Sequence, residues 1–419
     1  MGVERFFHLN GPAGEAEPEP RTEDAIVSES DPSVGPESEK FSPSPAPDIG
    51  PPGDEENGAD RSSTVMVDFL PEFSVPARVT KKRDREEEEA IQGPIGLDIG
   101  TTHIVMAEKK GSRIKTSLLP NAFFPVPYNS LTKQALLRDQ IIYLEKNTTL
   151  HILGYSAENF ANIFRSTVKK PIENGILNPR ENESEAILKA IINRLVKAPK
   201  RKGERVCFSM PGEPLDKPGT SLIYHESIIK EHLSGLGYDP VPVNEGMAVV
   251  LSELSGENFT GIGISLGGGM CNVCFSYLTV PVVTFSLLKG GDYIDAMVSQ
   301  SIGEPVSKVR QIKENTLDLS VSPRDKIEMG LHIYYDDLIT TLLQHLQNVL
   351  AASDNIPRLS RPLPIVLGGG TSLPRGVRDR FWKHLKATLL PCKISELVLA
   401  AKPLYATAKG ALMMALLGD

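Results

Sequence analysis

The residues best suited to chemistry in this chain of 419 residues lie in the heptapeptide Gly-Leu-Asp-Ile-Gly-Thr-Thr, residues 96–102. The pattern predicts a short apolar strand that carries one carboxylate, Asp98, and ends in a turn at Gly100. Glycine lets backbone N–H groups approach an anion closely, and the hydroxyls of Thr101 and Thr102 add donors. An aspartate beside such a turn can hold Mg²⁺ through its water ligands. Taken alone, the motif also fits an ordinary β-hairpin that binds nothing.

Two further glycine clusters point to a larger site, because each follows an apolar run of its own. They are Ile-Ser-Leu-Gly-Gly-Gly at residues 264–269 and Ile-Val-Leu-Gly-Gly-Gly-Thr at residues 365–371. Residues 261–277 also repeat the strand–turn–strand pattern of residues 95–108, as an internally duplicated fold would. Three turns of this kind can converge on one nucleotide.

The segments that would position these turns alternate between strand and helix patterns, which predicts an α/β fold. The expected strands are residues 95–99, 103–108, 140–144, 151–153 and 206–211. The expected helices are residues 183–196, 227–236, 245–254, 306–319, 338–350 and 403–417.

The composition narrows the class of protein. The formal net charge is −8, but residues 1–60 alone hold 15 Asp and Glu against 3 Lys and Arg. The acidity therefore belongs to this segment, and the rest gives no reason to expect nucleic acid as a partner. Four cysteines in so long a chain do not form a disulfide framework. We find no apolar stretch of membrane-spanning length and no signal peptide, so we expect a cytoplasmic protein.

Residues 1–92 are rich in Pro, Glu, Ser, Gly and Asp, and we expect them to form a disordered acidic tail and linker. Residues 65–73, Val-Met-Val-Asp-Phe-Leu-Pro-Glu-Phe, are either a short docking motif for a protein partner or only an apolar patch of tail. Residues 81–89 carry both signs of charge, which indicates a solvated linker.

Together with the glycine turns, three more segments resemble the actin-like ATPase superfamily of actin, the seventy-kilodalton heat-shock chaperones and the sugar kinases. They are Lys-Pro-Ile-Glu-Asn-Gly-Ile-Leu at residues 170–177, Val-Asn-Glu-Gly-Met-Ala at residues 243–248 and Gly-Gly-Asp-Tyr-Ile-Asp at residues 290–295. The resemblance covers residues 93–419 and is strongest to bacterial actins of the MreB type. It is least convincing for sugar kinases, because no motif with a catalytic aspartate for sugar phosphorylation follows the first lobe.

The resemblance implies a two-lobed, actin-like α/β fold, a duplicated ribonuclease H-like unit with a cleft for ATP and Mg²⁺. Residues 93–246 would form lobe I together with a C-terminal helix at residues 403–419, and residues 247–402 would form lobe II.

The family pattern also implies a role for each matching residue. Asp98 would hold hydrated Mg²⁺, and Glu245 would orient the attacking water, although a glutamate that merely begins a helix is equally compatible with the sequence. The nucleotide contacts implied by the resemblance are Gly100, Thr101 and Thr102 and Gly267, Gly268 and Gly269 for the phosphates, Gly368, Gly369 and Gly370 for adenosine, and Lys313 and Glu314 for ribose or base.

The chain departs from the family pattern at the second phosphate turn. Ser265 stands where the family usually has aspartate, and Met270 and Cys271 stand where it has threonines. Gly246 also replaces a proline after Glu245. Backbone amides supply much of the binding of phosphate, so we expect nucleotide binding to survive while hydrolysis is slow or lost.

Cys271 and Cys274 have the spacing of a zinc motif, but no second cysteine pair or histidine cluster accompanies them, so we expect buried thiols. Three functions remain open. The first is an ATP-binding cytoskeletal or scaffold protein that self-associates in response to nucleotide. The second is a chaperone-motor-like ATPase that acts on client proteins, and the third is a degenerate relative that binds a partner through its tail without turning over ATP.

Overall fold

The computed structural model describes residues 91, 93–217, 222–353, 356–357, 359 and 361–418. The predicted disordered tail lies outside the described residues except for its end, and so do the candidate docking segment 65–73 and the linker at 81–89. Ile91, which the sequence placed in the tail, is buried and forms a β-bridge with Pro199. The folded body therefore begins before residue 93.

The first lobe is built on a five-stranded sheet with the order β10-β9-β1-β2-β3. Its strands are β1 (Ile95–Ile99), β2 (His103–Lys110), β3 (Arg113–Pro120), β9 (Glu204–Met210) and β10 (Tyr238–Asn244). β1 runs antiparallel to β2 and parallel to β9, which in turn runs parallel to β10. The carboxyl end of β1, where the first glycine turn begins, thus lies beside the carboxyl end of β9.

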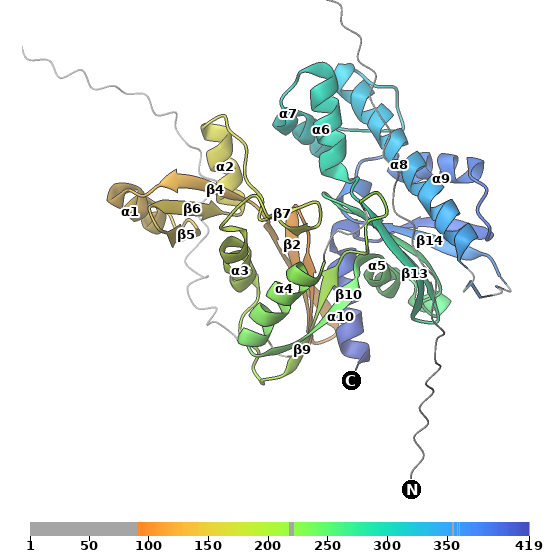
Figure 1. Ribbon diagram of the computed structural model, residues 1–419, viewed down its shortest axis with the longest axis horizontal. Helices are drawn as coiled ribbons and strands as arrows, with labels where there is room; N and C mark the ends of the chain where they lie inside the picture. Colours follow the sequence, from red (N-terminus) through yellow and green to blue (C-terminus); the bar gives the residue numbers. More distant parts are fainter. Residues whose placement is uncertain are drawn as a thin grey trace, which may run out of the picture. The chain divides into compact units, whose positions relative to one another are not determined.

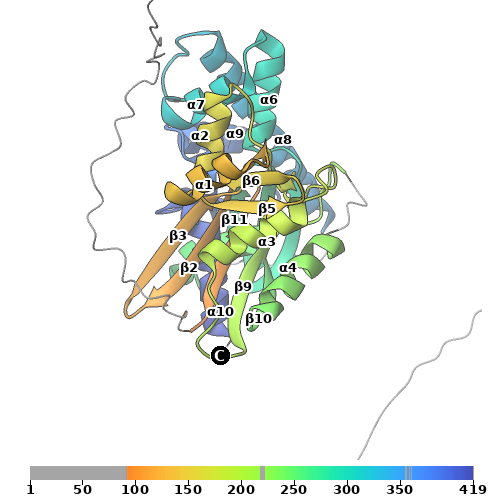
Figure 2. The ribbon, with the colours of Figure 1, turned by 90° about the vertical axis from the view of Figure 1, so that its left-hand side faces the viewer.

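Helices α3 (Ser184–Leu195) and α4 (Ile223–Gly235) cover one face of this sheet (Figure 2). Alternate residues of a strand point to opposite faces, so Val206 and Phe208 of β9 pack under these helices while Cys207 faces the other way.

The second lobe repeats the same topology with the order β13-β12-β11-β14-β15. Its strands are β11 (Gly261–Leu266), β12 (Cys271–Tyr277), β13 (Val280–Leu287), β14 (Leu363–Gly368) and β15 (Ile394–Leu399). β11 is antiparallel to β12 and parallel to β14, as β1 is to β2 and β9. The two-lobed, internally duplicated fold expected from the sequence is confirmed.

Four helices of the second lobe share one large apolar core with its sheet. They are α6 (Gly291–Ile302), α7 (Val306–Asn315), α8 (Lys326–Ala352) and α9 (Val377–Ala387).

Helices α5 (Glu245–Glu253) and α10 (Ala406–Leu417) pack against each other between the two sheets (Figure 1). Small residues allow close packing here, since a β-carbon on Gly410 would lie 1.7 Å from the carbonyl oxygen of Ala248. α10 also packs on β1, where a β-carbon on Gly96 would lie 2.1 Å from the backbone nitrogen of Leu412. The C-terminal helix therefore folds back on the sheet that carries Asp98.

Smaller elements flank the first lobe. They are β4 (Phe123–Pro127), α1 (Ser130–Arg138), β5 (Tyr143–Lys146), β6 (Thr149–Leu153), α2 (Tyr155–Ile163), β7 (Ile172–Glu173) and β8 (Ile176–Leu177). Three short 3₁₀ helices complete the fold: η1 (Ser255–Glu257), η2 (Gly370–Ser372) and η3 (Pro403–Tyr405). No helix in the described part of the chain is long and apolar enough to cross a membrane.

Several predicted elements differ in where they begin or end. The helix expected at residues 306–319 is α7, which ends at Asn315. The strand expected at residues 140–144 begins only at Tyr143, because Gln140 adopts a φ of 54° and turns the chain there. The helix expected at residues 338–350 is the second half of α8, a single helix of 27 residues.

Candidate functional site

A cavity of about 210 Å³ lies where the three glycine turns meet, between the carboxyl ends of the central strands of the two lobes. The predicted site residues that line it are Asp98, Gly100, Thr101, Thr102, Glu245, Gly267, Gly268, Gly269, Lys313, Glu314, Gly369 and Gly370. Gly368 is the exception, because it is the last residue of β14 and its free side faces Val249 and Ala406 in the core. A direct contact of Gly368 with adenosine is therefore not supported by its position.

The first turn joins β1 to β2 and is closed by a hydrogen bond from the Gly100 N–H to the His103 carbonyl, at 3.0 Å. The Thr101 hydroxyl accepts a hydrogen bond from the Gly175 N–H at 3.0 Å, which attaches the turn to the β7–β8 hairpin. The Asn121 side-chain amide donates to the Gly100 carbonyl at 2.9 Å. These bonds fix the turn from three sides before any ligand is considered.

The second turn is built in the same way and is also bonded to the start of α6. The Gly267 N–H donates to the Met270 carbonyl at 2.9 Å, and the Asp292 N–H donates to the Gly268 carbonyl at 2.7 Å. The hydroxyl of Thr371, which follows the third turn, donates to the Gly267 carbonyl at 2.7 Å. The second and third turns therefore form one rigid wall of the cavity.

The first and second turns approach each other so closely that only glycine fits. A β-carbon on Gly268 would lie 2.2 Å from the Thr102 Oγ1, and one on Gly269 would lie 2.4 Å from the Thr101 Oγ1. The two threonine hydroxyls and the backbone of the second turn thus face the same small space.

Two carboxylates, Asp98 from β1 and Glu245 from the start of α5, lie at the inner end of the cavity. Ser209 donates to Asp98 at 2.9 Å, and Ser265 donates to Glu245 at 3.1 Å. Burial raises the pKa of Asp98 to about 6, and burial together with the charge of Asp98 raises the pKa of Glu245 to about 8. Two partly exposed acids that repel each other at the inner end of a cavity form an environment that a divalent cation would stabilise. These residues fit a Mg²⁺ ion.

Lys313 and Glu314 line the cavity from α7, but the Lys313 ammonium is already engaged within the second lobe. It donates to Asp295 and to the Gly291 carbonyl, both at 2.8 Å. Glu314 lies at the rim, where burial raises the pKa of its carboxyl. Contacts of these two residues with ribose or base remain predictions.

Met270 and Cys271, which replace the family threonines, are both buried. The Met270 sulfur packs against Gly175 of the first lobe, and a β-carbon on Gly175 would lie only 2.1 Å from it. Gly175 has a φ of 74°, a conformation that also favours glycine. An apolar contact therefore joins the lobes at the position where the family pattern supplies a hydroxyl.

Sequence reasoning missed several residues of the cavity wall. They are His103, Gly175, Gly291, Asp292, Tyr335, Thr371, Leu373, Pro374 and Leu404. Asp292 lies in one of the motifs that carried the resemblance, so a signal for it was present. The apolar residues Leu373, Pro374 and Leu404 had no local signal, because the fold brings two distant segments, after η2 and in η3, to the cavity.

Comparison with known proteins identifies the family. Residues 94–415 match the profile of the family described as Volactin. The chain belongs to the Volactin family. The curated proteins contain no match to this Volactin-family chain.

Among solved structures, the MamK double helical filament is similar to this Volactin-family chain with a TM-score of 0.59 and 17% sequence identity, over 77% of this chain and 98% of that chain. MreB5 of Spiroplasma citri bound to AMPPNP matches with a TM-score of 0.55 and 15% identity, over 76% of this chain and 94% of that chain. The same protein bound to ADP matches with a TM-score of 0.53 and 16% identity, over the same 76% and 94%. The actin-like, MreB-like fold is thereby confirmed.

Proposed function

We propose that this Volactin-family protein binds ATP with Mg²⁺ in its interlobe cleft and assembles with further copies of itself in response to the nucleotide. The observation that carries the proposal is the convergence of three strand-then-glycine turns and two carboxylates on one cavity. We further propose lobe limits of 93–246 with 403–419 for lobe I and 247–402 for lobe II. The cytoplasmic location and a partner for residues 65–73 remain predictions.

The proposed binding mode uses the backbone more than side chains. Gly267, Gly268 and Gly269 would present N–H groups to phosphate oxygens, opposite the hydroxyls of Thr101 and Thr102. A bound Mg²⁺ would supply positive charge to offset the phosphates. Asp98 would hold the water ligands of that ion, and Gly369 and Gly370 would allow close approach of the nucleoside.

Glu245 is placed to orient and deprotonate a water molecule, but the site limits how well it does so. Its raised pKa keeps a large share of the carboxyl protonated near neutral pH unless a cation lies close by. Ser265 offers a hydroxyl where the family pattern has a carboxylate, and this hydroxyl occupies one oxygen of Glu245. We therefore propose that hydrolysis is slow compared with nucleotide binding.

Self-association is supported by the fold, since a solved relative is described as a double helical filament. The test is sedimentation of the full chain with Mg²⁺ and ATP, ADP, AMPPNP or no nucleotide, with phosphate release measured in the same tube. We expect sedimentable polymer with ATP or AMPPNP and little phosphate. Rapid phosphate release without polymer would favour the chaperone-motor-like alternative instead.

A further inference from the structure

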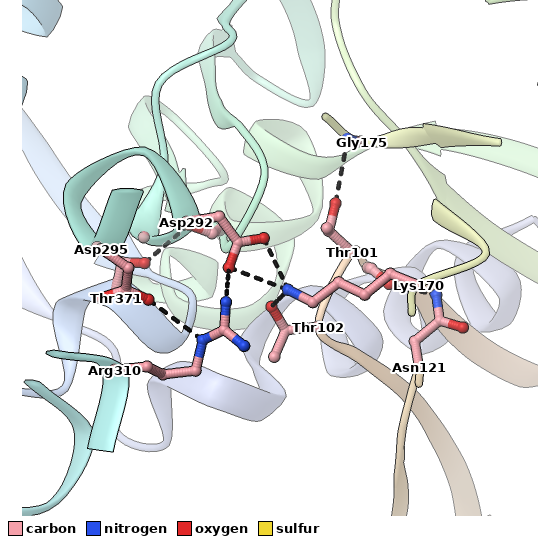
Figure 3. A network of polar contacts seen from close by, with 12 residues as sticks. Thr101, Thr102, Asn121, Lys170, Gly175, Asp292, Asp295, Arg310 and Thr371 are labelled. Atoms are coloured by element: carbon pink, nitrogen blue, oxygen red, sulfur yellow. Dashed lines mark hydrogen bonds and ion pairs between the residues drawn. The ribbon is translucent and has the colours of Figure 1, made fainter. Parts of the chain in front are cut away.

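A lysine from the first lobe crosses the cleft and pairs with the second lobe at the phosphate end of the cavity (Figure 3). The Lys170 ammonium lies 2.7 Å and 3.0 Å from the two carboxylate oxygens of Asp292, in the first turn of α6. It also lies 3.5 Å from the hydroxyl of Thr102 in the first glycine turn. Only 16% of the Lys170 side chain is exposed.

Lys170 belongs to a network of cations and carboxylates that lies beside the cavity. Arg310 of α7 donates to Asp292 at 3.0 Å and to Asp295 at 3.2 Å (Figure 3), and Lys313 donates to Asp295. Three cations thus share two carboxylates. The attraction of Lys170 and Arg310 outweighs burial and holds the pKa of Asp292 at about 2, so this carboxylate is ionised.

Two further acids lie near the network. Glu158 of α2 and Glu314 of α7 both line the groove beside Lys170. Burial raises the pKa of each carboxyl, and the charge of Glu314 adds to the shift for Glu158. Lys170 also acts on the cavity itself, because burial and then the charge of Lys170 lower the pKa of His103 to about 4. Lys170 and Arg310 thus bring two cationic groups to the groove beside the cavity, where an anion can bind.

The position of Lys170 shows which part of a bound nucleotide it would meet. Thr102 contacts both the Lys170 ammonium and Gly268, so the ammonium borders the space between the two phosphate turns. On its other side, Lys170 lines a wider groove of about 1100 Å³ that shares Thr101, Asp292 and Glu314 with the cavity. The ammonium stands at the junction of the two spaces.

We propose that Lys170 binds the terminal phosphate of ATP, and that its ion pair with Asp292 is a latch that this phosphate displaces. The inference rests on the proposed function, because it assigns a residue to the same nucleotide site. A terminal phosphate carries more charge than a carboxylate and accepts more hydrogen bonds, so Lys170 gains by the exchange. Asp292 keeps Arg310 as its partner after the exchange, so the carboxylate is never left without a cation.

The latch gives the two lobes a way to distinguish ATP from ADP. Lys170 belongs to the first lobe, whereas Asp292 and Arg310 belong to helices of the second. ATP would replace the direct ion pair with a bridge through its terminal phosphate. ADP lacks that phosphate and would leave the ion pair in place.

The experiment compares Lys170→Met with Lys169→Met in the full chain. Lys169 is the adjacent lysine, but its side chain is 47% exposed and pairs with Glu181. Titration calorimetry measures the dissociation constants of Mg²⁺-ATP and Mg²⁺-ADP for each protein, with inorganic tripolyphosphate as a probe that lacks the nucleoside. Melting temperature without ligand reports whether each variant is folded.

We expect Lys170→Met to weaken binding of ATP and tripolyphosphate by about tenfold or more and binding of ADP by less than about twofold, while Lys169→Met changes none of them. Equal losses for ATP and ADP, or no loss, would overturn the assignment of Lys170. Wild-type protein that binds neither nucleotide would instead overturn the proposed function.

A second variant tests the latch and does not depend on the folding of the first. Asp292→Asn removes the competing anion while the amide oxygen still accepts a hydrogen bond from Arg310. We expect it to tighten ATP binding by about threefold or more, because Lys170 no longer has to leave a carboxylate. Unchanged or weaker ATP binding by this variant would show that the ion pair does not compete with phosphate.

Discussion

Replacing Glu245 by glutamine should change how the stability of the protein depends on pH. The folded chain holds the Glu245 proton up to about pH 8, whereas the unfolded chain releases it near the ordinary value of 4.5. Between these values the folded state binds more protons than the unfolded state, so the free energy of unfolding falls as pH rises. Glutamine has nearly the same shape, can still accept the Ser265 hydrogen bond and cannot ionise.

The size of the effect follows from the shift in pKa. A difference of one proton costs about 1.4 kcal/mol per pH unit, so Glu245 lowers the stability of the metal-free wild type by about 4 kcal/mol between about pH 5 and pH 8. Entry of water into the site would reduce this figure. Asp98 adds a similar slope at lower pH, because burial raises its pKa from 3.8 to about 6.

Urea unfolding followed by circular dichroism, with a chelator and no nucleotide, measures the free energy of unfolding at each pH. Glu245→Gln should lose most of the slope between about pH 5 and pH 8 and should exceed the wild type in stability at about pH 8. Glu253→Gln, at the other end of α5, is the matched control and should keep the wild-type slope. Parallel curves for wild type and Glu245→Gln would refute the account of the acid pair in the cavity.

Three further outcomes are expected at the same site. Ser265→Asp adds a third carboxylate beside Glu245, so it should lower the melting temperature in chelator, and Mg²⁺ with ATP should restore the melting temperature. Single-turnover hydrolysis by this variant should be faster than by the wild type, and an unchanged rate would show that the missing acid does not limit hydrolysis. Glu245→Ala should lower the residual hydrolysis rate by about 100-fold with little change in ATP affinity, because the Glu245 carboxyl acts mainly in the transition state. Comparable losses of hydrolysis rate and ATP affinity would mean that Glu245 has a binding role. A thiol reagent should label native protein mainly at the partly exposed Cys392, because burial raises the pKa of the Cys271 thiol, and rapid labelling of Cys271 would mean that the second turn opens.

The parts of the site with a local signal could be predicted from the sequence. Each glycine turn follows its own apolar strand, so three separate patterns pointed to one cavity, and twelve of the thirteen predicted site residues line it. Which glycine of a run faces a cavity depends on the register of the preceding strand. Gly368 is the last residue of β14 and pairs with Ser265 of β11, and the glycine-rich sequence alone does not reveal that pairing.

Some signals were present in the sequence but were not used. Asp325 caps the start of α8, because its side chain accepts a hydrogen bond from the Glu328 N–H. Ile327, Leu331 and Tyr335 of α8 are buried at helical spacing. An acidic cap followed three residues later by glutamate is a recognised start of a helix.

Other features depend on the tertiary structure alone. Lys170 and Asp292 lie 122 residues apart, and no periodicity or spacing links them. Ile91 follows a charged segment without an apolar pattern of its own, and only the bridge to Pro199 shows that it belongs to the body.

The most direct test of the central claim is titration calorimetry of Mg²⁺-ATP with the wild-type chain and with Asp98→Asn. This substitution retains an oxygen that can accept the Ser209 hydrogen bond but removes the charge proposed to hold the metal's waters. The account predicts saturable binding of one ATP by the wild type and binding weaker by about tenfold or more for the variant, with unfolding curves showing that both are folded. No binding of ATP by the wild type, or equal affinity in the two proteins, would contradict it.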